Sequence, residues 1–205
     1  MNNQISPGWA NVMEHEMPSQ GPPIWKVSDL PALLAGDGLA FKADPGFQEW
    51  AIGLEHALTW HWAMAGLPLP ADDFGGPDYQ IIGSISPKGV ATELLSAYQH
   101  PHMRIYRPNL PDGYQACLYA SVLKQAAYYG AYEYNNLGVG ESALAYFLKY
   151  LGIKLRLPVN HRFYCLQFYC QIWADFDFPL YDKDHPVTPY DLENTDQLQL
   201  IWGTF

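Results

Sequence analysis

The segment 111–135, PDGYQACLYASVLKQAAYYGAYEYN, decides the fold that the sequence predicts. Its polar side chains are few, and apolar or tyrosine side chains occupy nearly every face of the helix it would form. A helix that is apolar on all sides usually lies at the centre of a protein. We therefore predict a mainly α protein, an irregular or orthogonal multi-helix bundle around a central apolar helix at about 112–135, with long Pro- and Gly-rich loops and little or no strand.

Cap-and-proline signatures predict further helices around this segment. Asp44-Pro45, Ser86-Pro87 and Thr188-Pro189 each place a capping side chain before a proline, which suits the first helical position. Residues 1–27 form a Pro-rich arm, and residues 28–205 are expected to form a single helical domain. The helices expected besides the central one span 44–66, 86–98, 141–151, 161–174 and 188–202, whereas 79–82 and 100–108 are expected to be extended.

Composition excludes several classes of protein. The chain has 205 residues, of which 49% are hydrophobic and 16% charged, and this excludes a disordered protein. A net charge of -10, from 21 acidic against 11 basic side chains, argues against nucleic acid as a partner. No apolar run is long enough to span a bilayer, and the first residues do not form a secretory signal. We expect a cytoplasmic protein with no membrane partner and no cofactor.

The three cysteines, Cys117, Cys165 and Cys170, have no disulfide-framework spacing. Because free cysteine is among the most buried residue types, all three are expected to be buried thiols. None is expected to begin a helix or to lie beside a cationic histidine, the two settings that lower a thiol pKa. The sequence therefore predicts no nucleophilic cysteine.

Histidines offer a second hypothesis. His100 and His102 are two residues apart in an extended segment, so they point the same way, and Glu93 or His56 is a candidate third ligand. One such pair does not complete a ligand set, and we expect no bound metal. The alternative function is a small helical enzyme or ligand-binding protein with a His- and Tyr-lined aromatic pocket, whose candidate residues are His56, His61, His100, His102 and Glu93.

The acidic stretch 175–196 carries the leading hypothesis. It contains seven carboxylates and a single lysine, interleaved with aromatic side chains. Aromatic anchors and steering carboxylates suit a binding surface for a cationic partner. We expect a protein-binding or inhibitory protein, like an immunity protein by analogy of class alone, that recognises a basic protein. A structural subunit of a larger assembly is a third possibility. The predicted partner-binding residues are Asp175, Asp177, Phe178, Tyr181, Asp182, Asp184 and Tyr190.

Overall fold

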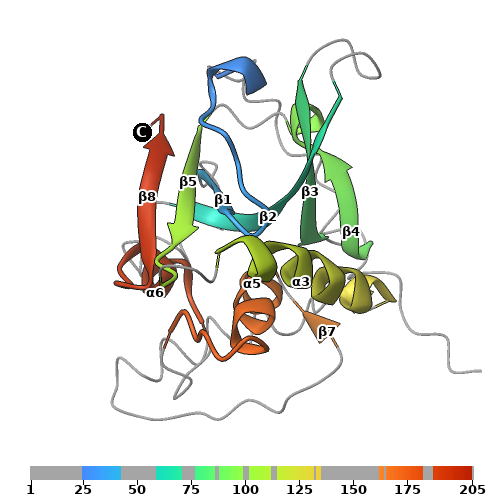
Figure 1. The fold of residues 1–205 in the computed structure, drawn as a ribbon, viewed down its shortest axis with the longest axis vertical. Coiled ribbons are helices and arrows are strands. Elements are labelled where there is room, and N and C mark those ends of the chain that lie inside the picture. The colour runs from blue at the N-terminus through green and yellow to red at the C-terminus, as the bar shows by residue number, and fades with distance from the viewer. Residues whose placement is uncertain are drawn as a thin grey trace, which may run out of the picture.

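A six-stranded antiparallel sheet forms the body of the protein (Figure 1). The computed structural model describes residues 25–42, 59–70, 77–85, 88–98, 102–111, 115–131, 133–134, 162–163, 165–181 and 187–204. The strand order is β4-β3-β2-β1-β5-β8. The strands are β1 (Gly38–Lys42), β2 (Thr59–Leu69), β3 (Asp78–Ile85), β4 (Gly89–Leu94), β5 (Met103–Pro108) and β8 (Leu198–Gly203).

The prediction of a helical bundle is therefore wrong. Strand β2 occupies the second half of the segment predicted as helix 44–66, and its first half lies outside the described residues. In β2, Ala63 and Ala65 are buried on one face and Trp62 and Met64 on the other. A strand that is buried on both faces loses its polar–apolar alternation, and a short apolar run of this kind cannot be distinguished from a buried helix by its periodicity.

Two more segments that were predicted as helices contain strands instead. The segment 86–98 contains β4 and a short 3-10 turn, η3 (Leu95–Ala97). Thr188 does cap a helix, since its hydroxyl accepts from the backbone of Asp191, but this helix, α6 (Pro189–Glu193), ends after five residues and β8 follows. The strands expected at 79–82 and 100–108 are confirmed as parts of β3 and β5. The helix predicted at 141–151 lies outside the described residues.

The two longer helices are α3 (Gln115–Tyr128) and α5 (Cys165–Ala174). Helix α3 was predicted to be central, yet it is buried on one side only: Val122 and Ala126 are buried, whereas Lys124 and Tyr128 are exposed. Helix α5 is the buried helix, with seven of its ten residues in the core. The remaining short elements are η2 (Val27–Asp29), η4 (Tyr129–Ala131), β6 (Glu133–Tyr134) and β7 (Arg162–Phe163).

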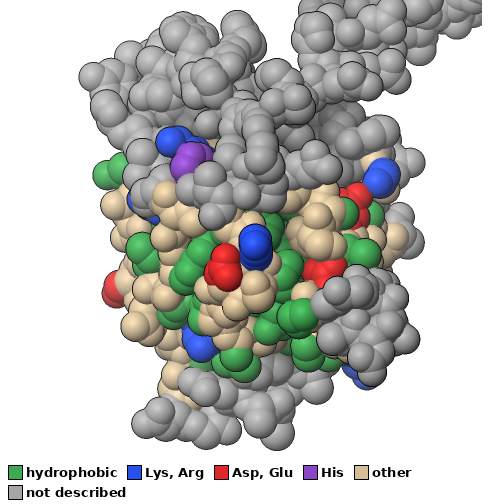
Figure 2. Space-filling view, turned by 90° about the horizontal axis from the view of Figure 1, so that it is seen from above, with side chains coloured by type: hydrophobic (Ala, Val, Ile, Leu, Met, Phe, Trp, Pro, Cys, Tyr) green, Lys and Arg blue, Asp and Glu red, His purple; other side chains and the backbone are tan. Residues whose placement is uncertain are grey.

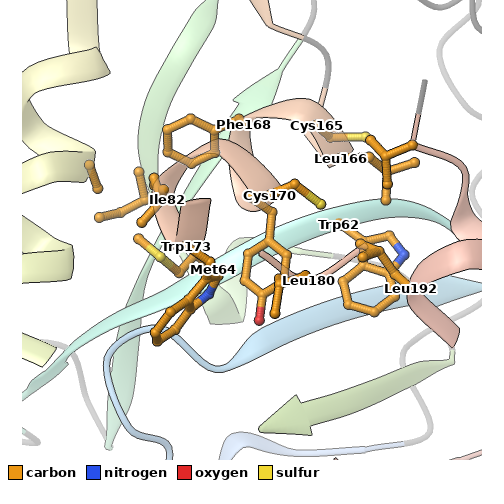
Figure 3. Packing of buried hydrophobic residues seen from close by; sticks show 14 of the residues in the cluster. Trp62, Met64, Ile82, Cys165, Leu166, Phe168, Cys170, Trp173, Leu180 and Leu192 are labelled. Carbon is orange, nitrogen blue, oxygen red and sulfur yellow. The ribbon is translucent and has the colours of Figure 1, made fainter. Parts of the chain in front are cut away.

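The core has two parts, one on each face of the sheet. One part joins the sheet to α5 and contains Trp62, Met64 and Trp173 (Figure 3). The other contains Phe41 and Tyr98. Among the described helices, none is long and apolar enough to cross a bilayer. On the described part of the face shown in Figure 2, side chains of both charges are scattered among hydrophobic ones.

Candidate functional site

Three rings from different elements stack beside the start of β2. The rings of Phe41, His61 and Tyr98 form a triangle: the centroid of Phe41, from β1, is 5.7 Å from that of His61 and 4.7 Å from that of Tyr98, and the last two centroids are 5.8 Å apart. The Nε2 of His61 and the hydroxyl of Tyr98 share a hydrogen bond of 3.1 Å. All three side chains are buried. The imidazole is thus held by a stacking partner and by a hydrogen bond, and this fixes the plane of its ring.

An irregularity in the sheet accompanies this histidine. Phe41 pairs with His61 across β1 and β2, but the next residue, Lys42, pairs with Thr59. The residue between, Trp60, has no partner in that register, which is the pattern of a β-bulge. Bulges re-aim neighbouring side chains and occur frequently next to functional sites. The bulge therefore favours a functional site near the start of β2.

Tyr98 is held in its neutral form. Burial raises the pKa of its phenol well above the ordinary range, and the charges of Glu93 and Cys165 raise the pKa further. The phenol therefore remains an O–H group that can both donate and accept a hydrogen bond. The carboxylate of Glu93 forms an ion pair with Lys88, with Oε1 and Nζ 2.7 Å apart.

Cys165 lies close to this group and at the first residue of α5. The prediction that no cysteine begins a helix is wrong, because the expected helix 161–174 starts four residues later than predicted. Burial raises the pKa of the Cys165 thiol, and hydrogen bonds from the backbone of Trp62, of Leu166 and of Cys165 itself partly oppose the rise. Two of these three donors belong to the first turn of α5, where backbone N–H groups have no partner within the helix.

Cys165 and His61 approach the same stretch of β2 from opposite faces. The ring of Trp62 packs on Tyr106 and Tyr169, on the α5 side, whereas strand alternation sends the side chain of His61 to the other side. The sulfur contacts the backbone of Trp62, one residue from His61, and its charge acts on the phenol that bonds to His61. The thiol therefore lies on one side of the sheet, and the imidazole and the phenol lie on the other.

Of the other histidine candidates, the structure describes His102. It is half-buried just before β5, and its backbone oxygen accepts a hydrogen bond from the N–H of Lys42, the residue after Phe41. His56 and His100 lie outside the described residues. Glu93, proposed as a third metal ligand, pairs with Lys88 instead. Among the described residues, no group of three or more His, Cys, Asp or Glu side chains has a metal-binding arrangement.

Several side chains of the acidic stretch are engaged in contacts within the protein. The carboxylate of Asp175 accepts hydrogen bonds from Gln125, Tyr129 and Gln171. Phe178 and Tyr181 are half-buried and pack on the core instead of standing free. The exposed members of the predicted set are Asp175, Asp177 and Tyr190, whereas Asp182 and Asp184 lie outside the described residues.

Comparison with known proteins identifies a fold and no family. No family model matches the chain, and no curated protein matches it significantly. A solved structure is similar: the metalloprotein YiiX from Escherichia coli O157:H7, described as DUF1105. It superposes with a TM-score of 0.59 over 84% of this chain and 98% of that one, at 13% sequence identity. At this identity the similarity shows a shared fold alone.

Sequence reasoning missed Tyr98 as a partner of His61 and Cys165 as a helix-start residue. Tyr98 is 37 residues from His61 in the chain, and the pairing of β2 with β3 and of β3 with β4, with the turn after β4, brings them together. Cys165 was missed because the helix was predicted to begin at residue 161. In the structure residues 162–163 form a strand, β7, and the helix begins at Cys165.

Proposed function

We propose that the protein is a thiol-dependent enzyme that acts on an acyl group, with Cys165 as nucleophile. The position of Cys165 carries the proposal, because it is the first residue of α5 and its sulfur accepts hydrogen bonds from the backbone of Leu166 and of Cys165 itself. Backbone N–H groups at the start of a helix favour the thiolate, the nucleophilic form of cysteine. His61 is not assigned as the base, because its side chain lies on the opposite face of β2 and bonds to Tyr98.

The reaction begins at the thiol. The sulfur of Cys165 forms a bond to the acyl carbon while its proton passes to water. The C–N or C–O bond to the leaving group then breaks, and the leaving group takes a proton from water. A second water molecule hydrolyses the thioester, releasing the acid and returning a proton to the sulfur. Backbone N–H groups of Cys165 and Leu166, at the start of α5, can stabilise the developing oxyanion.

The resting thiol is protonated, because burial raises its pKa. The nucleophile is accordingly generated by proton transfer during the reaction, as general-base catalysis requires. This distinguishes the site from one that holds a permanent thiolate.

Labelling by an acylating or alkylating reagent tests the proposal. Intact-protein mass spectrometry with an activated ester or iodoacetamide should show modification of Cys165, and Cys165→Ala should abolish it. Cys170→Ala is the matched control, since Cys170 is a second buried cysteine on α5 that does not begin the helix. Equal labelling of Cys165 and Cys170, or labelling that persists in Cys165→Ala, would contradict the proposal.

A second candidate is the binding of a basic protein through the acidic stretch. The side chains of Asp177 and Asp196 are exposed, and Tyr190 is 41% exposed on α6. Exposed carboxylates steer a cationic partner, and an exposed tyrosine can anchor it. Affinity capture from cells with wild-type protein and with Asp177→Asn/Asp196→Asn tests this candidate. A basic partner whose association slows in the double variant supports it, and an acidic partner, or none, overturns it.

A further inference from the structure

The pairing of β2 with β3 stops short of the start of β2. The paired residues nearest that end are Met64 and Ile82, and beyond them the described pairing of these two strands ends. Both strands nevertheless continue. β2 reaches back to Thr59, where it pairs with β1, and β3 runs on to Ile85, where it pairs with β4. The two strands therefore part at the level of Trp62.

The backbone N–H of Trp62 points toward β3 and away from β1. The N–H of Ala65 donates to the carbonyl oxygen of Asp37, just before β1, at 2.8 Å, so the backbone of Ala65 faces β1. Successive residues of a strand direct their N–H groups to opposite edges of that strand. Ala63 therefore also faces β1, whereas Met64 and Trp62 face β3. The N–H of Trp62 is thus directed into the place where β2 and β3 part.

The sulfur of Cys165 accepts a hydrogen bond from this N–H, and further ones from the backbone of Cys165 itself and of Leu166. Figure 3 shows the three residues together, with Trp62 on β2 and the other two on α5. The ring of Trp62 is fully buried and packs on Tyr106 and Tyr169, which holds the strand in position at this point. The sulfur is thus surrounded by donors from two elements, one from the sheet and two from the first turn of the helix.

We propose that the N–H of Trp62 completes an oxyanion hole with the N–H groups at the start of α5. The inference rests on the proposed role of Cys165 as a nucleophile. When the sulfur adds to an acyl carbon, an electron pair of the C=O bond moves to the oxygen, and it returns to the carbon as the bond to the leaving group breaks. This oxygen lies two bonds from the sulfur, within reach of the N–H groups that surround the sulfur. Donors held in place where negative charge develops stabilise the transition state strongly.

Replacement of a single backbone amide by an ester tests the assignment. An ester between His61 and Trp62 removes the N–H of Trp62 and keeps every side chain. Acylation of Cys165 by an activated ester should slow about a hundredfold or more, the usual cost of one lost oxyanion donor. Alkylation by iodoacetamide forms no oxyanion, so it should slow by about tenfold at most, the effect of one hydrogen bond to the sulfur. A purely structural role of this N–H would slow both reactions equally.

An ester between Trp62 and Ala63 is the matched control, because it removes an N–H that faces β1 instead of the sulfur. It should lower the melting temperature and leave the ratio of the acylation rate to the alkylation rate unchanged. Equal slowing of both reactions by the Trp62 ester, or acylation that this ester leaves unchanged, overturns the inference. Wild-type protein that is alkylated at Cys165 and never acylated overturns the proposed function, and the inference falls with it.

A second measurement uses the natural backbone. Addition of an aldehyde to the Cys165 thiol forms a thiohemiacetal, which places an oxygen on the carbon bound to sulfur, as in the acylation intermediate. The nuclear magnetic resonance of the Trp62 amide proton should shift on formation of this adduct, and that of the Ala63 amide proton should stay. An adduct that leaves the Trp62 amide proton unshifted overturns the inference, even where acylation of Cys165 supports the proposed function.

Discussion

Arg107 donates two hydrogen bonds to the carboxylate of Asp37, with its Nε 2.9 Å from Oδ1 and its Nη2 2.7 Å from Oδ2. The Asp37 side chain is fully buried at the start of β1, and it also accepts a hydrogen bond from the backbone of Leu34. Arg107 comes from β5, the neighbouring strand, and donates in addition to the carbonyl of Ala32. The pair thus holds the start of β1 in place, and β1 is the strand that contains Phe41 of the ring stack.

Removal of one partner of this ion pair should be costly. Arg107→Met leaves a buried carboxylate without its counterion, and breaking a buried pair in this way costs about 3 kcal/mol or more. We expect a loss of that size in the free energy of unfolding, measured by urea denaturation. The double variant Asp37→Asn/Arg107→Met should recover part of the loss, because no buried charge remains. Equal stability of Arg107→Met and wild type would contradict the role of the pair.

Tyr98→Phe should release His61 from its fixed orientation. Phenylalanine keeps the stacking on Phe41 and removes only the hydroxyl, so the change isolates the 3.1 Å hydrogen bond. We expect the nitrogen-15 shifts of His61 to change from those of one tautomer to a mixture, since the partner of a ring nitrogen selects the tautomer.

Phe41→Leu is the counterpart of that variant. It removes the stacked ring and leaves the hydroxyl of Tyr98 in place, so the tautomer of His61 should persist. If His61 shows a mixture of tautomers in Phe41→Leu but keeps one tautomer in Tyr98→Phe, then Phe41, and not Tyr98, selects the tautomer. The nitrogen-15 measurement requires no substrate, so it tests Tyr98 even if Cys165 proves inert.

Alkaline pH should destabilise the fold. Burial raises the pKa values of the thiols of Cys165 and Cys170 and of the phenol of Tyr169 above their ordinary values. The folded state therefore keeps these protons at a pH where the unfolded chain has begun to release them. The unfolded state then binds fewer protons, so stability falls as pH rises, by up to about 1.4 kcal/mol per pH unit for each group.

The melting temperature should accordingly be level near neutral pH and fall from about pH 8.5 upward, where a free thiol begins to ionise. Cys170→Ala removes one of the groups and should flatten the fall, although it lowers stability at neutral pH by creating a small cavity. A melting temperature that stays constant up to the ordinary pKa of tyrosine would contradict this prediction.

Glycine substitutions test the packing of α5 on β1. A Cβ at Gly38 would lie 2.8 Å from the hydroxyl oxygen of Tyr169, which is fully buried. Gly38→Ala should therefore destabilise the protein by about 1–3 kcal/mol, the usual cost of overpacking. Gly130 is the matched control, since a Cβ there meets nothing within 4 Å. Denaturation of both variants checks this prediction. A loss of unfolding free energy in Gly130→Ala that is only a small fraction of the loss in Gly38→Ala would confirm the close approach.

Several features were accessible from the sequence because they rest on local chemistry. The extended segments predicted at 79–82 and 100–108 are β-branched or flanked by prolines, and the cap at Thr188 needs only residues three apart. Burial of the thiols of Cys165 and Cys170 is likewise confirmed, since it follows from residue type. The side chain of Cys117 lies outside the described residues.

The tertiary structure alone decided the fold class and the composition of the site. β2 and α5 are both apolar on all sides, and nothing in their periodicity assigns one to a sheet and the other to a helix. What separates them is pairing: β2 has hydrogen-bonding neighbours on both edges, in β1 and β3, whereas α5 makes its backbone hydrogen bonds within itself. Likewise, His61 meets Tyr98 only because the strands between them fold back on one another. Contacts across the sheet depend on register, and register is fixed when all the strands are packed together.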